Sequence, residues 1–111
     1  MTREELAQGQ CVPLSGAGHR LDAARLDALL ALLPGWARDG EAIARSFDFT
    51  GYEATLAFAN AVARIAQEQD HHPDITFGYS RCRVVYSTHS VGGISLNDLI
   101  CAAKIEALPR P

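Results

Sequence analysis

The chain has 111 residues, enough for one domain with a real core, although the surface fraction of so small a domain stays high. Its composition, 48% hydrophobic and 21% charged, is ordinary for a soluble globular protein. The net charge of -3 gives no electrostatic reason to expect binding to nucleic acid or to an acidic membrane, and it argues against a direct reader of DNA.

No targeting segment can be identified at the N-terminus, which carries Glu4 and Glu5 and leads into no apolar run. The longest uninterrupted apolar stretch, residues 28–33, is far too short to cross a bilayer. We therefore expect a cytoplasmic protein without a membrane partner.

The three cysteines, Cys11, Cys82 and Cys101, are odd in number, widely spaced and free of any C-x-x-C pairing. This pattern argues against a disulfide framework and against a thiolate metal site. Cys82 and Cys101 lie in apolar segments, so we expect both to be small core residues.

The first half of the chain predicts a leader, a helix and a hairpin. Residues 1–18 are rich in glycine and weakly patterned, so we expect a loosely ordered leader before a domain at 19–111. After Asp22, leucines recur at helical spacing until Pro34 ends the helix. Residues 36–49 predict a hairpin turning at Asp39-Gly40, and Arg45 on its apolar face suggests a sheet edge or an interface.

A long helix is predicted next. Thr50 and Glu53 have the spacing of a capping box, with Thr50 as the N-cap. Two apolar rows follow on adjacent faces, and their members are Leu56, Ala59, Ala63 and Ala66, and Phe58, Val62 and Ile65. Pro73 disfavours the helical conformation for His72, so the helix has to end near Asp70.

The last third predicts a second hairpin and a final helix. Residues 75–79 and 82–86 alternate in polarity around a turn at 78–81, and Ser95 is a helix N-cap with Asp98 in the first turn. The order is α-β-β-α-β-β-α. We expect a single α+β domain with a four-stranded antiparallel sheet and helices packed on one face.

Three of the four histidines, His71, His72 and His89, lie at the two ends of this second hairpin. Because the ends of an antiparallel hairpin meet, the segment around His71 should lie beside the segment around His89. Histidine can give or take a proton near neutrality, with an unperturbed pKa of about 6.5. The pattern predicts a shared site for general acid and base catalysis.

Plainer explanations exist for each residue alone. Histidines at a helix C-terminus are favoured by the helix dipole, His89 fits an exposed loop, and Asp98 fits a first-turn charge. Tyr79 fits an aromatic that packs on its strand neighbours. A metal site is weakly supported, because adjacent histidines in extended backbone point to opposite sides and no zinc-type spacing is present.

Taken together, the residues resemble the pterin-4a-carbinolamine dehydratases. The likeness covers most of the chain, and its motifs are Leu32 to Trp36, Phe47-Asp48-Phe49, Asp70-His71-His72-Pro73-Asp74, Tyr79, Thr88-His89 and Asp98. The resemblance implies an α+β domain that forms a homodimer or homotetramer. It also implies an enzyme that dehydrates the 4a-hydroxytetrahydropterin left by an aromatic amino acid hydroxylase, giving quinonoid dihydropterin in tetrahydropterin recycling, with no metal and no cofactor.

The resemblance also assigns roles to residues. Catalysis falls to His71, His72 and His89, and substrate binding falls to Asp70, Pro73, Ser87, Thr88 and Asp98. Gln67 and Tyr79 support the site. Members usually carry a charged residue, most often glutamate, four positions before the first histidine, where this chain has Gln67; glutamine can orient an imidazole but cannot exchange a proton.

The chemistry needs an acid to protonate the leaving hydroxyl and a base to take the proton from N5. We expect His71 and His89 to carry these transfers and His72 mainly to hold the pterin, because Pro73 restricts its backbone. Two alternatives remain open: a weakly catalytic pterin-binding or assembly module of the same fold, and a zinc-dependent hydrolase, which a chelator would inhibit.

Overall fold

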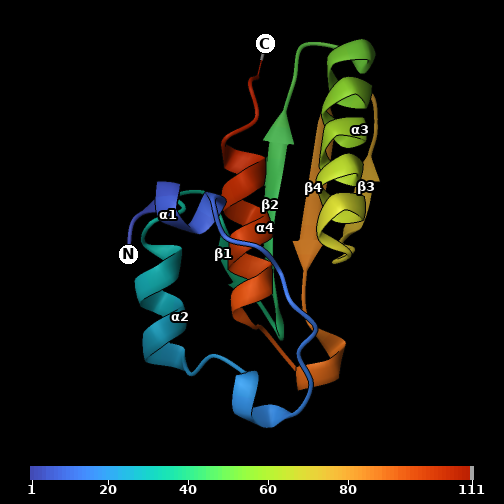
Figure 1. Cartoon of the computed structure of the whole chain (residues 1–111). Helices are drawn as coiled ribbons and strands as arrows, with labels where there is room; N and C mark the ends of the chain where they lie inside the picture. The colour runs from blue at the N-terminus through green and yellow to red at the C-terminus, as the bar shows by residue number, and fades with distance from the viewer. Residues whose placement is uncertain (111) are drawn as a thin grey trace.

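The computed structural model describes residues 1–110. Figure 1 shows the elements in chain order, and they are α1 (Arg3–Ala7), η1 (Ala17–His19), α2 (Ala23–Leu30), β1 (Ala37–Asp39), β2 (Ala42–Asp48), α3 (Tyr52–Gln69), β3 (Asp74–Phe77), β4 (Arg81–Tyr86), η2 (His89–Val91) and α4 (Leu96–Glu106). Here η marks a short 3₁₀ turn. The two predicted hairpins and the three predicted helices are all present, and they form one small α+β domain.

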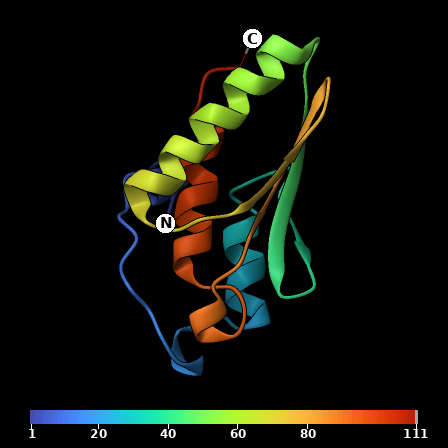
Figure 2. The same cartoon turned by 90° about the vertical axis from the view of Figure 1, so that its right-hand side faces the viewer.

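The sheet is antiparallel throughout, with strand order β1-β2-β4-β3. Cys82 of β4 pairs with Phe47 of β2 on one side and with Phe77 of β3 on the other. Helices α3 and α4 lie on the same side of the sheet (Figure 2). The core forms between these layers, where the rings of Phe47 and Phe58 pack in a tilted arrangement with centroids 4.6 Å apart. The predicted one-faced arrangement is confirmed.

The start of α3 differs from the predicted capping box. Gly51 is the N-cap, and no side chain caps the helix there. The Thr55 hydroxyl instead donates to the carbonyl oxygens of Gly51 and Tyr79, at 2.8 and 3.1 Å, which ties the first turn to the tip of the second hairpin. Of the two predicted apolar rows, Leu56 and Ala63 are exposed, because the face toward the sheet is centred on Phe58 and Val62.

Arg45 has an explanation other than the predicted sheet edge or interface. It lies on β2, between β1 and β4 in the sheet order, although β1 pairs only with residues 42–44. The Arg45 guanidinium forms an ion pair with Glu106 of α4, with Nη1 and Oε1 2.7 Å apart, and lies 4.7 Å from the centroid of the Phe47 ring. A partner on the helix layer therefore permits a charge on the helix-facing side of the sheet.

Residues 1–18 have more order than the predicted leader. Thr2 and Glu5 form a capping box at the start of α1, and Leu6 is buried. The next segment, residues 10–14, is here called the strap; it runs between the end of α3 and the start of α4. Several backbone groups of the strap are bonded to side chains of those two helices. These long-range contacts give order to a segment whose own sequence has little pattern.

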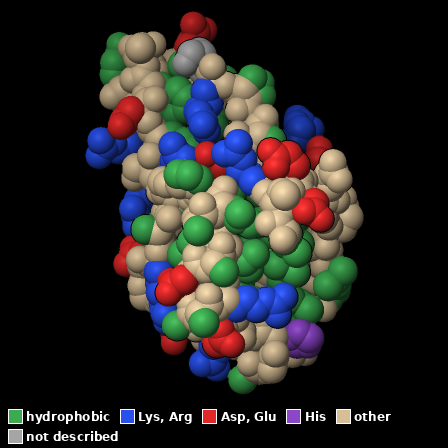
Figure 3. All heavy atoms as spheres, turned by 90° about the vertical axis from the view of Figure 1, so that its left-hand side faces the viewer, with side chains coloured by type: hydrophobic (Ala, Val, Ile, Leu, Met, Phe, Trp, Pro, Cys, Tyr) green, Lys and Arg blue, Asp and Glu red, His purple; other side chains and the backbone are tan. Residues whose placement is uncertain are grey.

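The side of the molecule where α1 and α2 lie carries acidic and basic side chains interspersed with hydrophobic ones (Figure 3). This mixture agrees with the small net charge of the sequence. Within residues 1–110, none of the helices combines the length and apolarity that a membrane span requires.

Candidate active site

The C-terminus of α3 delivers the first histidine. Asp70 adopts a left-handed backbone conformation, with φ of 49°, directly after the last helical residue. The amide of His71 donates to the Ala66 carbonyl at 3.1 Å, and the amide of Asp70 donates to the Gln67 carbonyl at 3.3 Å. This is the Schellman pattern of helix termination. It reverses the chain direction and fixes the backbone of His71 against the end of β4.

Asp98, in the first turn of α4, forms the centre of a buried polar cluster. Its Oδ2 accepts from the Ser95 backbone amide and from the Thr88 hydroxyl, both at 2.9 Å. Its Oδ1 lies 2.6 Å from Nε2 of His71. The carboxylate is fully buried, so these three hydrogen bonds replace the water that it loses on folding. The predicted Ser95 cap is confirmed, and Asp98 completes its capping box.

The His71 ring is held on several sides. It stacks on the ring of Tyr86, with centroids 5.1 Å apart, and the Tyr86 hydroxyl donates to the His71 carbonyl at 3.0 Å. Burial lowers the pKa of His71, but the hydrogen bond and the charge of Asp98 outweigh burial and raise it above its ordinary value of 6.5. His71 is therefore an imidazole that keeps its proton more strongly than a free histidine. Because Nε2 is engaged by Asp98, Nδ1 is the nitrogen left for proton transfer.

His71 faces a hollow of about 320 Å³. Its walls are Cys11, Val12, Pro13 and Leu14 of the strap, together with Gln69, Asp70, His71, Thr88, Ser90 and Asn97. A volume near 300 Å³ is at the lower end of the range for small-molecule pockets. The hollow therefore combines a fixed, protonatable imidazole with hydroxyl, amide and carboxylate groups.

The structure separates His72 from His71. The His72 side chain is exposed, and its Nε2 lies 3.1 Å from Oε1 of Gln67. Gln67 would face His71 one turn away if the helix continued to His71, but the helix ends at Gln69 and the left-handed Asp70 turns His71 toward the sheet. Gln67 therefore contacts the second histidine and not the first.

His89 does not share the hollow of His71. It is exposed on η2 and lines a second hollow of about 200 Å³, together with Ser87, Thr88 and residues 41–42. Thr88 lines both hollows and stands between them. The prediction that the two ends of the hairpin meet is confirmed for His71 and Thr88, whose Nε2 and Oγ1 are 3.5 Å apart. The prediction that the imidazoles of His71 and His89 converge in one pocket is not confirmed.

Three further predicted site residues are placed as follows. Asp98 has no exposed surface, so its position fits a residue that orients His71 and Thr88 and not the expected contact with substrate. Pro73 follows the histidine pair without lining either hollow. Tyr79 is 73% exposed at the hairpin tip and lines neither hollow, so its supporting role stays a prediction.

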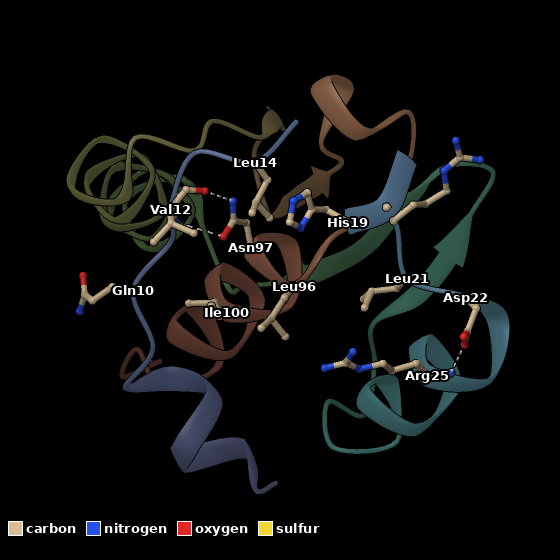
Figure 4. A pocket seen from close by; sticks show the side chains of 12 residues that line it. Gln10, Val12, Leu14, His19, Leu21, Asp22, Arg25, Leu96, Asn97 and Ile100 are labelled. Carbon is tan, nitrogen blue, oxygen red and sulfur yellow. Dashed lines mark hydrogen bonds between the residues drawn. The ribbon is translucent and has the colours of Figure 1, made fainter. Parts of the chain in front are cut away.

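Sequence reasoning missed the strap and Asn97 as parts of this site, and also Gln69, Tyr86 and Ser90. The Asn97 amide donates to the Val12 carbonyl at 2.8 Å and accepts from the Val12 amide at 3.3 Å, as Figure 4 shows. The strap also borders a third hollow, of about 410 Å³, which is lined by His19 and Arg25 as well (Figure 4). The one available signal was Asn97, a second polar side chain next to Asp98 in the first turn of α4. The strap itself has no recognisable motif.

Among residues 1–110, no three histidine, cysteine, aspartate or glutamate side chains are grouped as a metal site would require. The geometry thus provides no argument for the zinc-dependent alternative.

Comparison with known proteins agrees with this arrangement. The profile of the pterin 4 alpha carbinolamine dehydratase family matches residues 19–108. A relative from Stenotrophomonas maltophilia, provisionally named a pterin-4-alpha-carbinolamine dehydratase, is 53% identical over 105 residues, which cover 93% of this chain and 90% of the relative. A relative from Nitrosospira multiformis with the same provisional name is 49% identical over 107 residues, covering 96% and 95% of the two chains.

Two solved structures are also similar. A transcriptional coactivator/pterin dehydratase from Brucella melitensis superimposes with a TM-score of 0.76 and 34% identity, covering 79% of this chain and 96% of that one. A pterin dehydratase-like protein identified as a RuBisCO assembly factor in the alpha-carboxysome superimposes with a TM-score of 0.57 and 26% identity, covering 66% and 87%. By its sequence match and by its fold, the chain belongs to the pterin-4a-carbinolamine dehydratase family.

Proposed function

We propose that the protein removes water from a 4a-hydroxytetrahydropterin to give quinonoid dihydropterin, with His71 as the general acid. The observation that carries this proposal is the pairing of His71 with the buried Asp98 at a hollow of small-molecule size. The pairing favours the protonated imidazole near neutral pH, which is the form that a general acid needs.

The reaction breaks the C4a–O bond and forms a double bond between C4a and N5. Hydroxide is a poor leaving group, so a proton from Nδ1 of His71 converts it into water as the bond breaks. The proton on N5 then leaves to a base, and the pterin becomes neutral quinonoid dihydropterin. A positioned acid or base typically contributes about 10²–10⁴-fold to the rate.

His89 and bulk water are the two candidates for that base. His71 and His89 line different hollows, and Thr88 lines both of them. A single substrate can therefore contact both imidazoles only if it extends across Thr88. His72 is exposed, is bonded to Gln67 and lines neither hollow, so its expected role in holding the pterin stays a prediction. The His89→Ala variant separates the candidates, because loss of turnover identifies His89 as the base and unchanged turnover identifies water.

A direct dehydration assay tests the proposal. A synthetic 4a-hydroxytetrahydropterin is mixed with the purified protein, and the appearance of quinonoid dihydropterin is followed by its absorbance, with and without a chelator. We expect acceleration over the spontaneous reaction and no effect of the chelator. A rate equal to the spontaneous one would refute the enzyme proposal, and loss of activity with the chelator would favour a metal-dependent enzyme.

A second candidate function is an assembly or dimerisation module that has kept a pterin-binding pocket. It is favoured by the two similar structures, which are described as a transcriptional coactivator/pterin dehydratase and a RuBisCO assembly factor. It predicts no turnover together with tight association with another protein. The predicted homodimer or homotetramer, the link to an aromatic amino acid hydroxylase and the cytoplasmic location stay predictions, and size-exclusion chromatography with light scattering measures the first of them.

A further inference from the structure

Two cysteines that are 90 positions apart in the sequence meet beside the hollow of His71. Cys11 belongs to the strap and Cys101 to α4, and their sulfur atoms are 3.5 Å apart. Cys101 is fully buried, whereas Cys11 is partly exposed and lines the hollow. Both are thiols in this structure.

The surroundings hold the two sulfurs in this position. The Cys11 amide donates to Oε1 of Gln69 at 2.8 Å, and the next residue, Val12, is bonded on both sides to Asn97. Cys101 is one helical turn beyond Asn97 on the same helix. A disulfide bond is about 2.0 Å long, so the sulfurs have to approach by about 1.5 Å, a distance that a small rotation of the Cys11 side chain can supply.

The chemistry of the pair also favours reaction. The hydrogen bond from the Cys11 thiol lowers the pKa of Cys101; burial opposes this, while hydrogen bonding from Tyr86 and the nearby His71 assist it. The same hydrogen bond, together with burial, raises the pKa of Cys11. The pair therefore gives up its first proton from Cys101, and Cys11 keeps the proton that lies between the two sulfurs. Cys82 is the internal contrast, because it is buried in β4 and burial raises its pKa. A thiolate is the form of cysteine that attacks an oxidant.

We propose that Cys11 and Cys101 are a redox pair, which a small hydroperoxide converts into an intramolecular disulfide that locks the strap onto α4 beside the hollow of His71. The strap is then joined to the helix by a covalent bond as well as by hydrogen bonds, so a wall of the hollow becomes fixed. The proposal concerns a modification of the chain and does not depend on the dehydratase activity.

The reaction is balanced with hydrogen peroxide as the oxidant. Cys11, which faces the hollow, gives its proton to the Cys101 thiolate and attacks one peroxide oxygen. An S–O bond forms, the O–O bond breaks, and the second oxygen leaves as hydroxide, which takes up the proton that the pair had released and becomes water. The sulfur of Cys101 then attacks the Cys11 sulfur; the S–S bond forms, the S–O bond breaks and a second water leaves. Two thiols are oxidised by two electrons in all, and one peroxide is reduced to two waters.

The test uses the full chain treated with increasing hydrogen peroxide and then alkylated before and after reduction. We expect the intact mass to fall by two hydrogen atoms, one thiol to remain free, and peptide mapping to join Cys11 to Cys101. The Cys11→Ser and Cys101→Ala variants should lose this product. The matched control, Cys82→Ala, removes the third thiol and should still form it. Hydrogen exchange at residues 10–14 should be slower in the oxidised protein and should recover on reduction.

Several results would overturn the proposal. These are addition of oxygen atoms to Cys11 without cross-linking, a disulfide between two molecules, involvement of Cys82, or a cross-link that forms only after unfolding. A disulfide that left exchange at residues 10–14 unchanged would contradict the locking of the strap. If Cys101→Ala fails to fold, Cys11→Ser still decides the result, because Cys11 is partly exposed and its serine keeps a polar side chain.

Discussion

His71 and His72 are neighbours in the chain and occupy opposite environments. The His71 side chain is only 13% exposed, stacks on Tyr86 and lies 2.6 Å from the carboxylate of Asp98. The His72 side chain is exposed and is bonded to the neutral amide of Gln67 at 3.1 Å. Two identical side chains thus differ in burial, in the charge of their partner and in what they can contact.

The difference arises from the backbone and not from the residue type. The left-handed Asp70 and the Schellman bonds turn the chain so that His71 faces the end of β4 and the start of α4. Successive residues in extended backbone point to opposite sides, so His72 faces away. Only one histidine of the pair can therefore reach a buried carboxylate, and the proposed general acid is the one that does.

Substitution of each histidine gives the largest expected contrast. His71→Ala should lower kcat of the proposed dehydration by about 10²–10⁴-fold, the usual contribution of a positioned acid. His72→Ala should mainly raise KM and leave kcat close to wild type. His71→Gln keeps a hydrogen-bond donor for Asp98 but cannot transfer a proton. If circular dichroism shows that this variant is folded, its loss of kcat reports the loss of proton transfer and not a loss of structure. Equal losses of kcat in the two alanine variants would show that the environments do not divide the roles.

Removal of the Asp98 charge should abolish the raised pKa of His71. In Asp98→Asn, burial remains while the hydrogen-bonded charge is lost, so the pKa of His71 should fall below 6.5. The amide leaves buried partners unsatisfied, and we expect the free energy of unfolding to fall by about 1–3 kcal/mol. NMR titration and urea denaturation measure the two effects. Asp74→Asn, at an exposed carboxylate on β3, is the control and should change the unfolding free energy by less than about 0.5 kcal/mol.

The stability of the wild-type protein should depend on pH through the same pair. The pKa of His71 is higher in the folded state than its ordinary value of 6.5, so the folded state binds more protons between these two values. The stabilisation is therefore complete below 6.5 and is lost as pH rises through the folded pKa, with a slope of at most about 1.4 kcal/mol per pH unit. Urea denaturation over this range measures it. A slope that persists in His71→Gln would assign the effect to another group.

The smallest expected effect concerns the exposed member of the comparison. Gln67→Glu places a carboxylate beside His72, and an exposed pair of this kind contributes about 0.2–1 kcal/mol. We therefore expect kcat to change by at most about five-fold, without a change in the pKa of His71. Measurement of kcat of the variant as a function of pH tests this expectation. A larger gain in rate would mean that the second histidine takes part in proton transfer.

Much of the fold follows from local signals in the sequence. The leucines before Pro34, the alternation in residues 82–86 and the Ser95 cap each predict an element that the structure contains, because each signal acts within one turn or one strand. The predictions that failed depend on distant partners. Thr50 is not the cap of α3, and Arg45 is explained by Glu106, 61 positions away.

The candidate site also combines features that the local sequence predicts with features that depend on distant contacts. The sequence by itself determined that His71 follows a helix end, that the hairpin returns Thr88 beside it and that Asp98 lies in a first helical turn. Only the tertiary structure decided that Asp98 contacts His71 and not His72, that His89 lies on the far side of Thr88, and that the strap closes the hollow. Side-chain spacing and turn chemistry are local and can be predicted from neighbours, whereas the direction of an imidazole depends on how three separate segments pack together.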